Sequence, residues 1–446
     1  MQQIADLHIH SKYSRACSPE LTLPNIDKTC RIKGVDIIAA GDFTFPEWFS
    51  DIKDQLEEIK GRRNVDVSPS GLYKLKSAKD DKIKFLLSTE FALIYKDKDP
   101  SHKDGASKVR RIHLVVHAPN IEAVEELNKY LDKKYNIRSD GRPILGMTAP
   151  ELVKLCLSIH PKYLIYPAHI WTPWFAVFGS KSGFDSMEEC FHEFTKDIYA
   201  YETGLSSDPE MNWRLSALDK LTLLSNSDAH SLPNIGREAN VFDLAEITYD
   251  EIYNVIRSWR SHTTNAAHAN KINKSYLDYT IEFYPEEGMY HFDGHRECGV
   301  RLAPAETKKH KGICPVCKKP LTIGVMNRVN ELADRPVGFK PENVPGFKKL
   351  VELDKIIAEA INIKSRNSNA VQTEYNNLIN KLGPELKILI DIPLGEIQKV
   401  TLPAITEGIK RVREGNLIVE PGFDGQYGTI RIFKDDEKKN NQGSLF

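Results

Sequence analysis

Short apolar runs alternate with longer amphipathic segments over residues 1–265. The runs have the length of buried strands, whereas segments such as 121–134 and 149–158 place apolar residues at helical spacing. This alternation predicts an α/β fold in which parallel strands are joined by helical crossovers. The polar stretches 64–84 and 96–110 are expected to form loops. The seven runs read IADLHIH, VDIIAAGD, KFLLSTE, RIHLVVH, YLIYPAH, YAYETG and LTLLSNSD.

Each apolar run ends in a residue that could bind a metal ion. Because the C-terminal ends of barrel strands converge on one site, this pattern predicts an active site at the open end of a barrel. Seven runs predict a distorted seven-stranded (β/α)7 barrel. The candidate residues at the ends of the runs are His8 and His10, Asp42, Glu90, His113 or His117, His169, Glu202 and Asp228.

The candidate ligands predict a centre with more than one metal ion. His8 and His10 lie two positions apart on a predicted strand, so their side chains share a face, and the spacing recurs at Asp228-Ala-His230. Seven or eight N and O ligands exceed what one ion needs, so two or three divalent ions (Zn, Mn or Mg) are expected. Glu90 is suited to bridging a pair, and paired ions favour phosphate displacement. Asp228, His10 and Glu90 are the predicted catalytic residues.

The remaining chain divides into three further parts. The barrel is expected over 1–285, a small zinc-binding domain over 286–325, a mainly helical domain over 326–436 and a flexible tail over 437–446. Helical spacing recurs at 348–363 and 370–382, where Gly-Pro at 383–384 ends the second helix. The segment 416–433 predicts two strands joined by a Gly-rich turn.

A compact Cys and His unit predicts one structural zinc ion. Two pairs, His295-x-x-Cys298 and Cys314-x-x-Cys317, are separated by fifteen residues and can supply four tetrahedral ligands. His291 and His310 are alternatives to His295. Residues 291–350 hold twelve Lys or Arg and six Asp or Glu, so this basic segment could contact DNA although the whole chain has a net charge of −1.

Composition favours a cytoplasmic protein. The seven cysteines are an odd number, and four of them are scattered, which argues against a disulfide framework. We expect no membrane association, because no apolar run reaches the length of a bilayer span and the N-terminus lacks a signal-peptide pattern.

Aromatic and basic residues near the candidate ligands could contact DNA. Large rings directly after His169 could stack on an extruded base or pack the barrel rim. Residues in the loop after the first strand could bind phosphate. The Gly-rich turn at 422–428 is expected to make a hairpin rather than a phosphate site. The candidates for DNA contact are Trp171, Trp174, Phe175, Lys12, Tyr13 and Arg15.

Several motifs resemble a known superfamily. DLHIHSKYS, GDF, PAH and SNSDAH, with the Glu of LSTE and the His of RRIHLVV, resemble the metal motifs of the polymerase-and-histidinol-phosphatase (PHP) superfamily. Within it, the chain is similar to the endonuclease Q family over nearly its whole length, including PAHIWTPW, ETGLSSDPEMN, LSNSDAHS, NIGREAN and REGNLIVEPG. The resemblance implies a barrel of PHP type and a DNA-repair enzyme. Such enzymes nick on the 5′ side of uracil, hypoxanthine and xanthine, and at abasic sites.

The resemblance also implies how the ligands divide among ions. One ion would have His8, His10, Glu90 and Asp228, and a second would have Glu90, His113 and His169. A third would have Asp42 and His230. At 41–43, however, this chain has Gly-Asp-Phe where the superfamily has Thr-Asp-His, so the third site has lost an imidazole. Glu202 could be a further ligand or a carboxylate that caps the core.

The C-terminal pentapeptide makes the sliding clamp a candidate partner besides DNA. Gln442-Gly-Ser-Leu-Phe446 is similar to the peptide by which bacterial repair proteins dock on the clamp, with Gly443 in place of the usual Leu. Leu445 and Phe446 would fill an apolar pocket of the clamp.

The sequence leaves two other functions open. A small-molecule phosphatase of the histidinol-phosphatase type would use a similar ligand set but would not need the zinc unit or the basic segment. A module that only binds nucleic acid would not need a nearly complete ligand set. We therefore predict a metal-dependent DNA endonuclease.

Overall fold

The computed structural model describes residues 1–63, 66–98, 107–262, 275–434 and 437. Its largest sheet has the strand order β16-β13-β12-β1-β2-β5-β4-β3. β1, β2 and β5 are parallel to one another, as the alternating pattern predicted. The strands are β1 (Gln2–Asp6), β2 (Ile37–Ala39), β3 (Leu56–Arg63), β4 (Asp66–Leu75), β5 (Lys84–Leu86), β12 (Ala239–Asp243), β13 (Tyr276–Glu282) and β16 (Gly346–Lys349).

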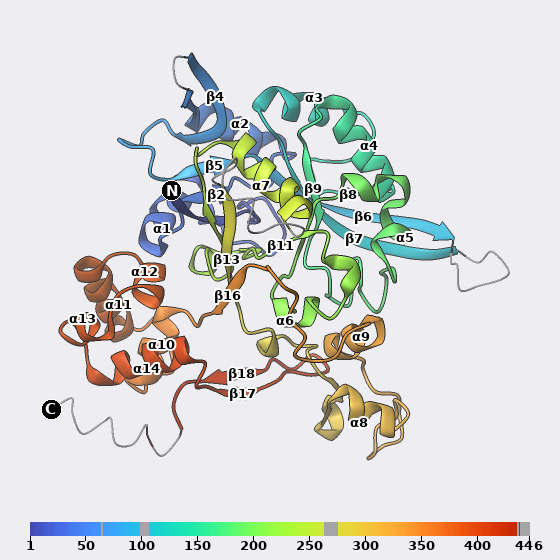
Figure 1. The fold of residues 1–446 in the computed structure, drawn as a ribbon, viewed down its shortest axis with the longest axis vertical. Coiled ribbons are helices and arrows are strands. Elements are labelled where there is room, and N and C mark those ends of the chain that lie inside the picture. Colours follow the sequence, from blue (N-terminus) through green and yellow to red (C-terminus); the bar gives the residue numbers. More distant parts are fainter. Residues whose placement is uncertain (64–65, 99–106, 263–274, 435–436, 438–446) are drawn as a thin grey trace.

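A second sheet has the order β8-β6-β7-β9, and a separate pair joins β10 to β11. β6 and β7 form a long antiparallel hairpin that projects from the body of the molecule (Figure 1). The strands are β6 (Ser88–Lys98), β7 (Ser107–His117), β8 (Ile144–Leu145), β9 (Leu164–Pro167), β10 (Ala200–Glu202) and β11 (Thr222–Leu224).

The described strands form open sheets, and no closed barrel is present among them, so the predicted seven-stranded (β/α)7 barrel is corrected to a mixed α/β fold. Isolated contacts, rather than strand ladders, span the gaps between the described sheets. Ile9 bridges to Ala229, and the Ile170 amide donates to the Glu202 carbonyl at 3.1 Å. The ends of β1, β9 and β11 nevertheless contribute residues to two neighbouring groups of candidate ligands.

Parts of the two stretches that were expected to be loops are strands. Residues 66–75 form β4, and residues 96–98 and 107–110 extend the β6–β7 hairpin. Backbone hydrogen bonds stabilise a hairpin whatever the polarity of its side chains, so hydropathy alone gave the wrong prediction here.

Seven helices of the described N-terminal part of the chain pack around these sheets. α3 buries Ala123, Val124, Leu127 and Leu131 on one face, and a capping box between Thr148 and Glu151 starts α4. The helices are α1 (Leu23–Lys33), α2 (Pro46–Gln55), α3 (Ile121–Leu131), α4 (Ala149–Ile159), α5 (Met187–Phe191), α6 (Pro209–Asn212) and α7 (Tyr249–His262).

A small unit with little core of its own follows β13. It contains the hairpin β14 (Asp293–His295) and β15 (Val300–Leu302), and the helices α8 (Pro304–Lys309) and α9 (Val325–Leu332). Figure 1 shows α8 at the margin of the molecule, away from the sheets.

The C-terminal region is mainly helical, as predicted. α11 ends at Leu382 and is followed by Gly383 with a φ of 101°. The Gly-rich turn joins two short antiparallel strands, β17 (Ile418–Glu420) and β18 (Thr429–Arg431). The helices are α10 (Leu353–Ala360), α11 (Asn369–Leu382), α12 (Glu385–Ile390), α13 (Leu394–Gln398) and α14 (Pro403–Glu414).

The helical region packs directly on the N-terminal part of the chain. One hydrophobic cluster contains Ile38 of β2, Leu114 of β7 and Ile356 of α10. β16, which precedes α10, lies parallel to β13 in the large sheet. Among the described residues, no helix is both long and apolar enough to span a bilayer.

A buried ion pair links the two parts. Lys33 Nζ of α1 lies 2.8 Å from Glu385 Oε2 of α12, and the two side chains are 9% and 3% exposed. Glu385 also accepts hydrogen bonds from the Tyr375 hydroxyl at 2.6 Å and the Leu353 amide at 3.2 Å. Removing the lysine would therefore leave a buried carboxylate without its cation.

We predict that Lys33→Met lowers the free energy of unfolding by about 3 kcal/mol, because an uncompensated buried charge is costly. Urea denaturation measures this change. Lys53→Met is the matched control, because Lys53 pairs with Glu125 at 3.0 Å on the surface and should cost less than about 1 kcal/mol. Equal effects of the two substitutions would contradict the prediction.

Candidate metal centre

Four predicted ligands form a first group that could hold a metal ion: His8, His10, Glu90 and Asp228. His10 Nε2 lies 3.3 Å from Glu90 Oε2 and 3.1 Å from Asp228 Oδ1. His8 Nε2 lies 3.7 Å from each of these two oxygens. The two histidines follow β1 and Asp228 follows β11, so the ends of these strands bring the side chains together.

Glu90, His113 and His169 form a second group. His113 Nδ1 lies 2.7 Å from Glu90 Oε1, and His169 Nε2 lies 3.1 Å from the same oxygen. The two imidazole nitrogens are 3.2 Å apart. His169 follows β9, whereas Glu90 and His113 lie within β6 and β7, so these two residues do not follow the rule that ligands stand at strand ends.

Glu90 faces both groups. Its Oε2 atom points toward the first and its Oε1 atom toward the second. A carboxylate in this position can bridge two ions, which is the arrangement that the residue types predicted.

The donor atoms fit divalent metal ions. His8 Nε2, His10 Nε2 and Asp228 Oδ1 are buried, and within the described part of the chain none makes a hydrogen bond. Buried polar atoms usually have partners, so three such atoms that face one point are suited to binding a metal ion there. The imidazole and carboxylate set suits zinc or manganese.

Asp42 contacts His10 of the first group and is itself in neither group. Its Oδ1 atom lies 3.0 Å from His10 Nδ1. Its Oδ2 atom accepts hydrogen bonds from the Ser11 amide and hydroxyl and from the Ser14 hydroxyl, at 2.6–2.8 Å. Both oxygens are therefore occupied. Asp42 fixes the ring of His10, as carboxylates beside metal-binding histidines commonly do.

Glu202 has the same role for His8. Its Oε2 atom lies 3.0 Å from His8 Nδ1, and its Oε1 atom accepts a hydrogen bond from the His169 amide at 3.1 Å. The Asn226 amide donates to it at 2.9 Å. Glu202 is thus a buried carboxylate that contacts two histidines and lies in neither metal group.

The other two predicted histidines lie outside both groups. His230 Nδ1 lies 2.8 Å from the carbonyl oxygen of Asp228, and its ring centroid is 4.6 Å from that of His10. His117, the alternative to His113, lies 2.9 Å from the Tyr166 hydroxyl. Asp42 and His230, the predicted ligands of a third ion, belong to neither of these two groups.

The electrostatics of the site favour a bound cation. Burial alone would lower the pKa of His8, but Glu202 and Glu90 raise it well above its usual value. Asp42 has the same effect on the pKa of His10. Burial lowers the pKa of His113 to about 4, so this ring is neutral near pH 7 and can bind a metal. The buried carboxylates of the site therefore favour a cation bound near them.

Arg142 is a member of the site that the sequence did not reveal. Its Nη1 atom lies 2.9 Å from Glu90 Oε2. Burial opposes its charge, but Glu90 and Asp228 raise the pKa of Arg142. Arg142 lies in a polar turn before β8, where a basic residue gives no sign of a buried partner.

Three residues of the site have left-handed backbone conformations. The φ angles of Asp42, His169 and Asp228 are 47°, 30° and 47°. This region is unfavourable for residues with a Cβ atom and costs on the order of 1 kcal/mol or more. Such backbone strain is common where a chain must turn sharply to present a functional side chain.

An aromatic pocket adjoins the second metal group. It has a volume of about 330 Å³ and is lined by His113, His169 and Asp228 together with Trp174 and Phe175. The ring of Phe175 lies 4.6 Å from that of His113. The pocket extends to Tyr290 and Tyr427. Tyr290 belongs to the predicted zinc-binding segment 286–325, called the zinc unit below, and Tyr427 to the Gly-rich turn 422–428.

Trp171 is a correction to the predicted set. Its side chain is 1% exposed, its Nε1 donates to Asn212 Oδ1 at 2.8 Å, and its ring packs on Phe178. The residue therefore belongs to the core and cannot contact DNA in this conformation. Trp174, which is 40% exposed, can.

The predicted phosphate-binding loop is only partly accessible. Tyr13 stacks on Phe45 with centroids 4.4 Å apart. Lys12 Nζ lies 3.6 Å from Asp51, and Arg15 is exposed. The order of accessibility in this loop therefore favours Arg15 as the phosphate contact.

The Cys and His unit brings its four predicted ligands together: His295, Cys298, Cys314 and Cys317. Cys317 Sγ lies 3.9 Å from His295 Nδ1. The alternative His291 is buried against Phe292, with ring centroids 5.2 Å apart, and lies outside this group. His310 follows directly after α8 and also lies outside the group. The four atoms suit a tetrahedral zinc ion.

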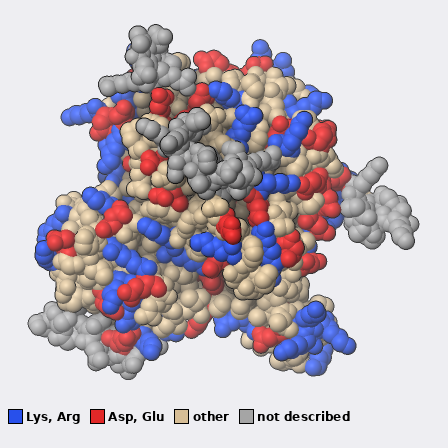
Figure 2. Space-filling model, in the orientation of Figure 1, with Lys and Arg blue, Asp and Glu red and all other residues tan. Residues whose placement is uncertain are grey.

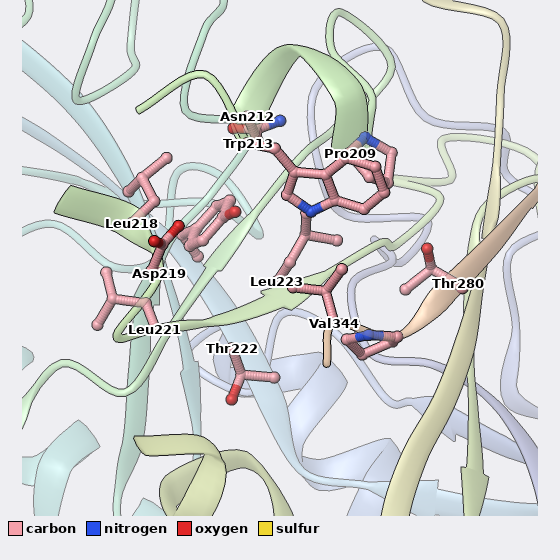
Figure 3. Close-up of a pocket in the computed structure, with 13 residues that line it drawn as sticks. Pro209, Asn212, Trp213, Leu218, Asp219, Leu221, Thr222, Leu223, Thr280 and Val344 are labelled. Carbon is pink, nitrogen blue, oxygen red and sulfur yellow. The ribbon is translucent and has the colours of Figure 1, made fainter. Parts of the chain in front are cut away.

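Figure 3 shows a small, mostly apolar cavity, and none of its lining residues belongs to a metal group. It has a volume of about 30 Å³ and is lined mainly by residues such as Trp213, Leu218 and Leu221. Its one acidic lining residue, Asp219, pairs with Arg335. These side chains offer no reactive group, so this cavity is not part of the site.

Two solved structures resemble the whole chain. The lesion-specific endonuclease PfuEndoQ from Pyrococcus furiosus is 28% identical, with a TM-score of 0.79 and coverage of 99% of both chains. Endonuclease Q in complex with a 27-mer duplex that has an abasic lesion at the active site is also 28% identical, with a TM-score of 0.78 and coverage of 98% of both chains. The chain is therefore similar to endonuclease Q over nearly its whole length.

Two curated proteins that are similar to parts of the chain are named as uncharacterized. MJ0043 of Methanocaldococcus jannaschii is 32% identical over 262 residues, which are 58% of this chain but only 31% of that protein. YqxK of Bacillus subtilis is 25% identical over 326 residues, 72% of this chain and 74% of YqxK. Residues 352–416, which include α10–α14, match the family described as the MJ0043 C-terminal domain.

We predict that Asp42→Asn lowers the affinity for Mn²⁺ by about 10- to 100-fold, because an orienting partner of His10 is weakened. Isothermal titration calorimetry of the metal-free protein measures this. Asp36→Asn is the matched control, since Asp36 is a partly buried carboxylate that accepts a hydrogen bond from the Ile4 amide outside the metal groups. An unchanged affinity in Asp42→Asn would refute the orienting role.

We also predict that Cys314→Ser removes one zinc ion per chain, because the four ligands form one closed site. Elemental analysis by mass spectrometry counts the zinc, and limited proteolysis should then cut within 291–325. Cys17→Ser should keep the ion, since Cys17 lies outside the unit. Retention of zinc in Cys314→Ser would exclude this site.

Proposed function

We propose that this chain is a metal-dependent DNA-repair endonuclease that hydrolyses the phosphodiester 5′ to deaminated bases and at abasic sites. The observation that carries the proposal is the pair of ligand groups that share Glu90 beside an aromatic pocket. The likeness to endonuclease Q, over nearly the full length of both chains, supports the same activity.

The two ligand groups suit phosphodiester hydrolysis. Two divalent cations at such a site would supply an activated water and stabilise the leaving oxygen. His8, His10, Glu90 and Asp228 would hold one cation, and Glu90, His113 and His169 the other. Asp42 and Glu202 keep the rings of His10 and His8 in the orientation that presents Nε2 to the cation.

Arg142 is placed to bind the phosphate. Its guanidinium is partly buried beside Glu90, where a non-bridging phosphate oxygen would approach the first group. An arginine can pair with such an oxygen through two donors and so align the backbone of the DNA with the catalytic carboxylates.

The aromatic pocket suits an extruded nucleotide. An enzyme that acts at a damaged base must withdraw the nucleotide from the helix stack, and aromatic rings can then hold it. Trp174 and Phe175, two of the predicted DNA contacts, line the pocket beside His113 and His169.

The zinc unit supplies positive charge for the duplex. Lys308, Lys309, Lys311, Lys318 and Lys319 are exposed on it, and Figure 2 shows basic side chains gathered over α8. Such a cluster can contact phosphates without regard to sequence. The partner would be duplex DNA, with Arg15 as a further contact.

Two further expectations remain predictions. Residues 442–446, the candidate clamp-binding peptide, lie outside the described residues, so docking on a sliding clamp rests on the sequence alone. A cytoplasmic location and a domain organisation of 1–285, 286–325, 326–436 and 437–446 likewise follow from the sequence.

A nicking assay tests the proposal. With Mn²⁺ or Mg²⁺, the protein should nick a uracil-containing duplex 5′ to the uracil and leave the undamaged duplex intact. Asp228→Ala should reduce nicking by about 100-fold or more, because a ligand of the first group is lost. Asp132→Ala, which removes an exposed carboxylate paired with Arg138, should nick like the wild type.

Hydrolysis of p-nitrophenyl phosphate tests the alternative function, that of a small-molecule phosphatase. Turnover of this monoester without nicking of any damaged duplex would favour a small-molecule phosphatase. The open pocket and the exposed lysines of the zinc unit favour the endonuclease, since a small phosphate ester would use neither.

A further inference from the structure

The Gly-rich turn at residues 422–428 brings an exposed tyrosine to the aromatic pocket. The turn joins β17 and β18, and Tyr427 lines the same pocket as His113, His169 and Asp228. The side chain of Tyr427 is 75% exposed. A large ring in this position is open to solvent on one side and to the pocket on the other, so it stands at the mouth.

The backbone of the turn is fixed to one wall of the pocket. The Gly422 amide donates to the Glu286 carbonyl at 2.8 Å, and the Gly428 amide donates to the Glu287 carbonyl at 3.0 Å. The Gly425 amide donates to the Met289 carbonyl at 3.0 Å. Since Gly288 and Met289 line the pocket, these bonds hold Tyr427 at a defined place beside it.

The glycines permit this close approach. A Cβ atom at position 428 would lie 2.0 Å from the Glu286 oxygen, and one at position 422 would lie 2.3 Å from the Gly288 oxygen. Any side chain at either position would push the turn away from the pocket wall and displace Tyr427.

The neighbours of Tyr427 anchor the turn to the zinc unit. Phe423 packs so closely on Gly294 that a Cβ there would lie 2.4 Å from the phenyl ring. Asp424 Oδ2 accepts a hydrogen bond from the Arg296 amide at 2.7 Å. These side chains are used for packing and bonding, whereas the exposed ring of Tyr427 is left to face the mouth.

The surrounding surface suits a nucleobase. Trp174 and Tyr290 are in edge-to-face contact, with centroids 5.6 Å apart, and both line the pocket with Phe175 and Tyr427. Every base has an aromatic face, and stacking on side-chain rings binds bases without regard to their hydrogen-bonding groups. A site for several different damaged bases needs recognition of this kind.

We propose that Tyr427 stacks on the base of the damaged nucleotide as it enters the pocket, and so sets the preference for damaged bases over sites that lack a base. This assignment rests on the proposed endonuclease function. It makes Tyr427, from the C-terminal end of the chain, a specificity-determining residue of a site whose metal ligands begin at residue 8.

The test compares two substrates of one sequence, a duplex with a uracil and a duplex with an abasic site. Tyr427→Ala should lower kcat/KM at uracil about tenfold, which corresponds to about 1.4 kcal/mol. At the abasic site it should change kcat/KM less than about twofold, because no base is present to stack. Tyr427→Phe and Tyr427→Trp should keep the uracil activity, since they retain a ring.

Tyr130→Ala serves as the matched control. Tyr130 is an exposed tyrosine on α3 outside the pocket, and its removal should leave both activities unchanged. Retained nicking of the abasic duplex by Tyr427→Ala shows in the same experiment that the variant is folded.

Two results would overturn the assignment. Equal losses on the two substrates would mean that the ring acts on the duplex or on the fold, and no loss at uracil would mean that the ring does not contact the base. A wild-type protein that nicks neither substrate would instead refute the proposed function, and this assignment with it. The wild-type rates therefore separate the two failures.

Discussion

The carboxylate of Glu90 is buried where three open sheets meet, and its two oxygens face different sets of imidazoles. A buried charge is stable only when opposite charge or hydrogen bonds compensate it. The compensation comes from His10 after β1, His113 on β7, His169 after β9 and Arg142 before β8. One side chain on β6 thus requires the large sheet and the four-stranded sheet to hold a fixed relative position.

A layer of positioning groups lies behind the imidazoles. Asp42 and Glu202 are both fully buried, and each accepts a hydrogen bond from the nitrogen that faces away from the site. The rings of His10 and His8 can therefore turn little. A cation entering such a site meets donors already in place, which reduces the ordering that binding requires. The strained backbones of Asp42, His169 and Asp228 contribute to the same preorganisation.

Much of this site could be predicted from the sequence, because polar residues at the ends of apolar runs are conspicuous. The members of both metal groups and the zinc ligands came from such patterns and from family resemblance. The distinction between a ligand and an orienting group did not, since Asp42 and Glu202 differ from true ligands only by which atoms their oxygens face. Arg142 had no signal at all. Trp171 was misjudged because a ring beside a ligand can point inward as readily as outward.

The α/β class of the fold could be predicted from the sequence, but the open form of its sheets could not. Strand and helix alternation gave the parallel core of β1, β2 and β5, whereas the hairpins β3–β4 and β6–β7 are held by backbone bonds that hydropathy does not report. The aromatic pocket was also beyond local patterns, because its walls come from segments around 174, 205, 289 and 427. No periodicity within one segment indicates that these four meet.

The pairing of β13 with β16 has a consequence for the zinc unit. These strands are parallel neighbours, so the 63 residues at 283–345 form one long crossover between them. Both ends of the crossover are therefore held in the same sheet by backbone hydrogen bonds. A force on the exposed lysines of the crossover, such as Lys308 and Lys309, is therefore transmitted through β13 and β16 to the large sheet. The same sheet contains β1, which is followed by His8 and His10.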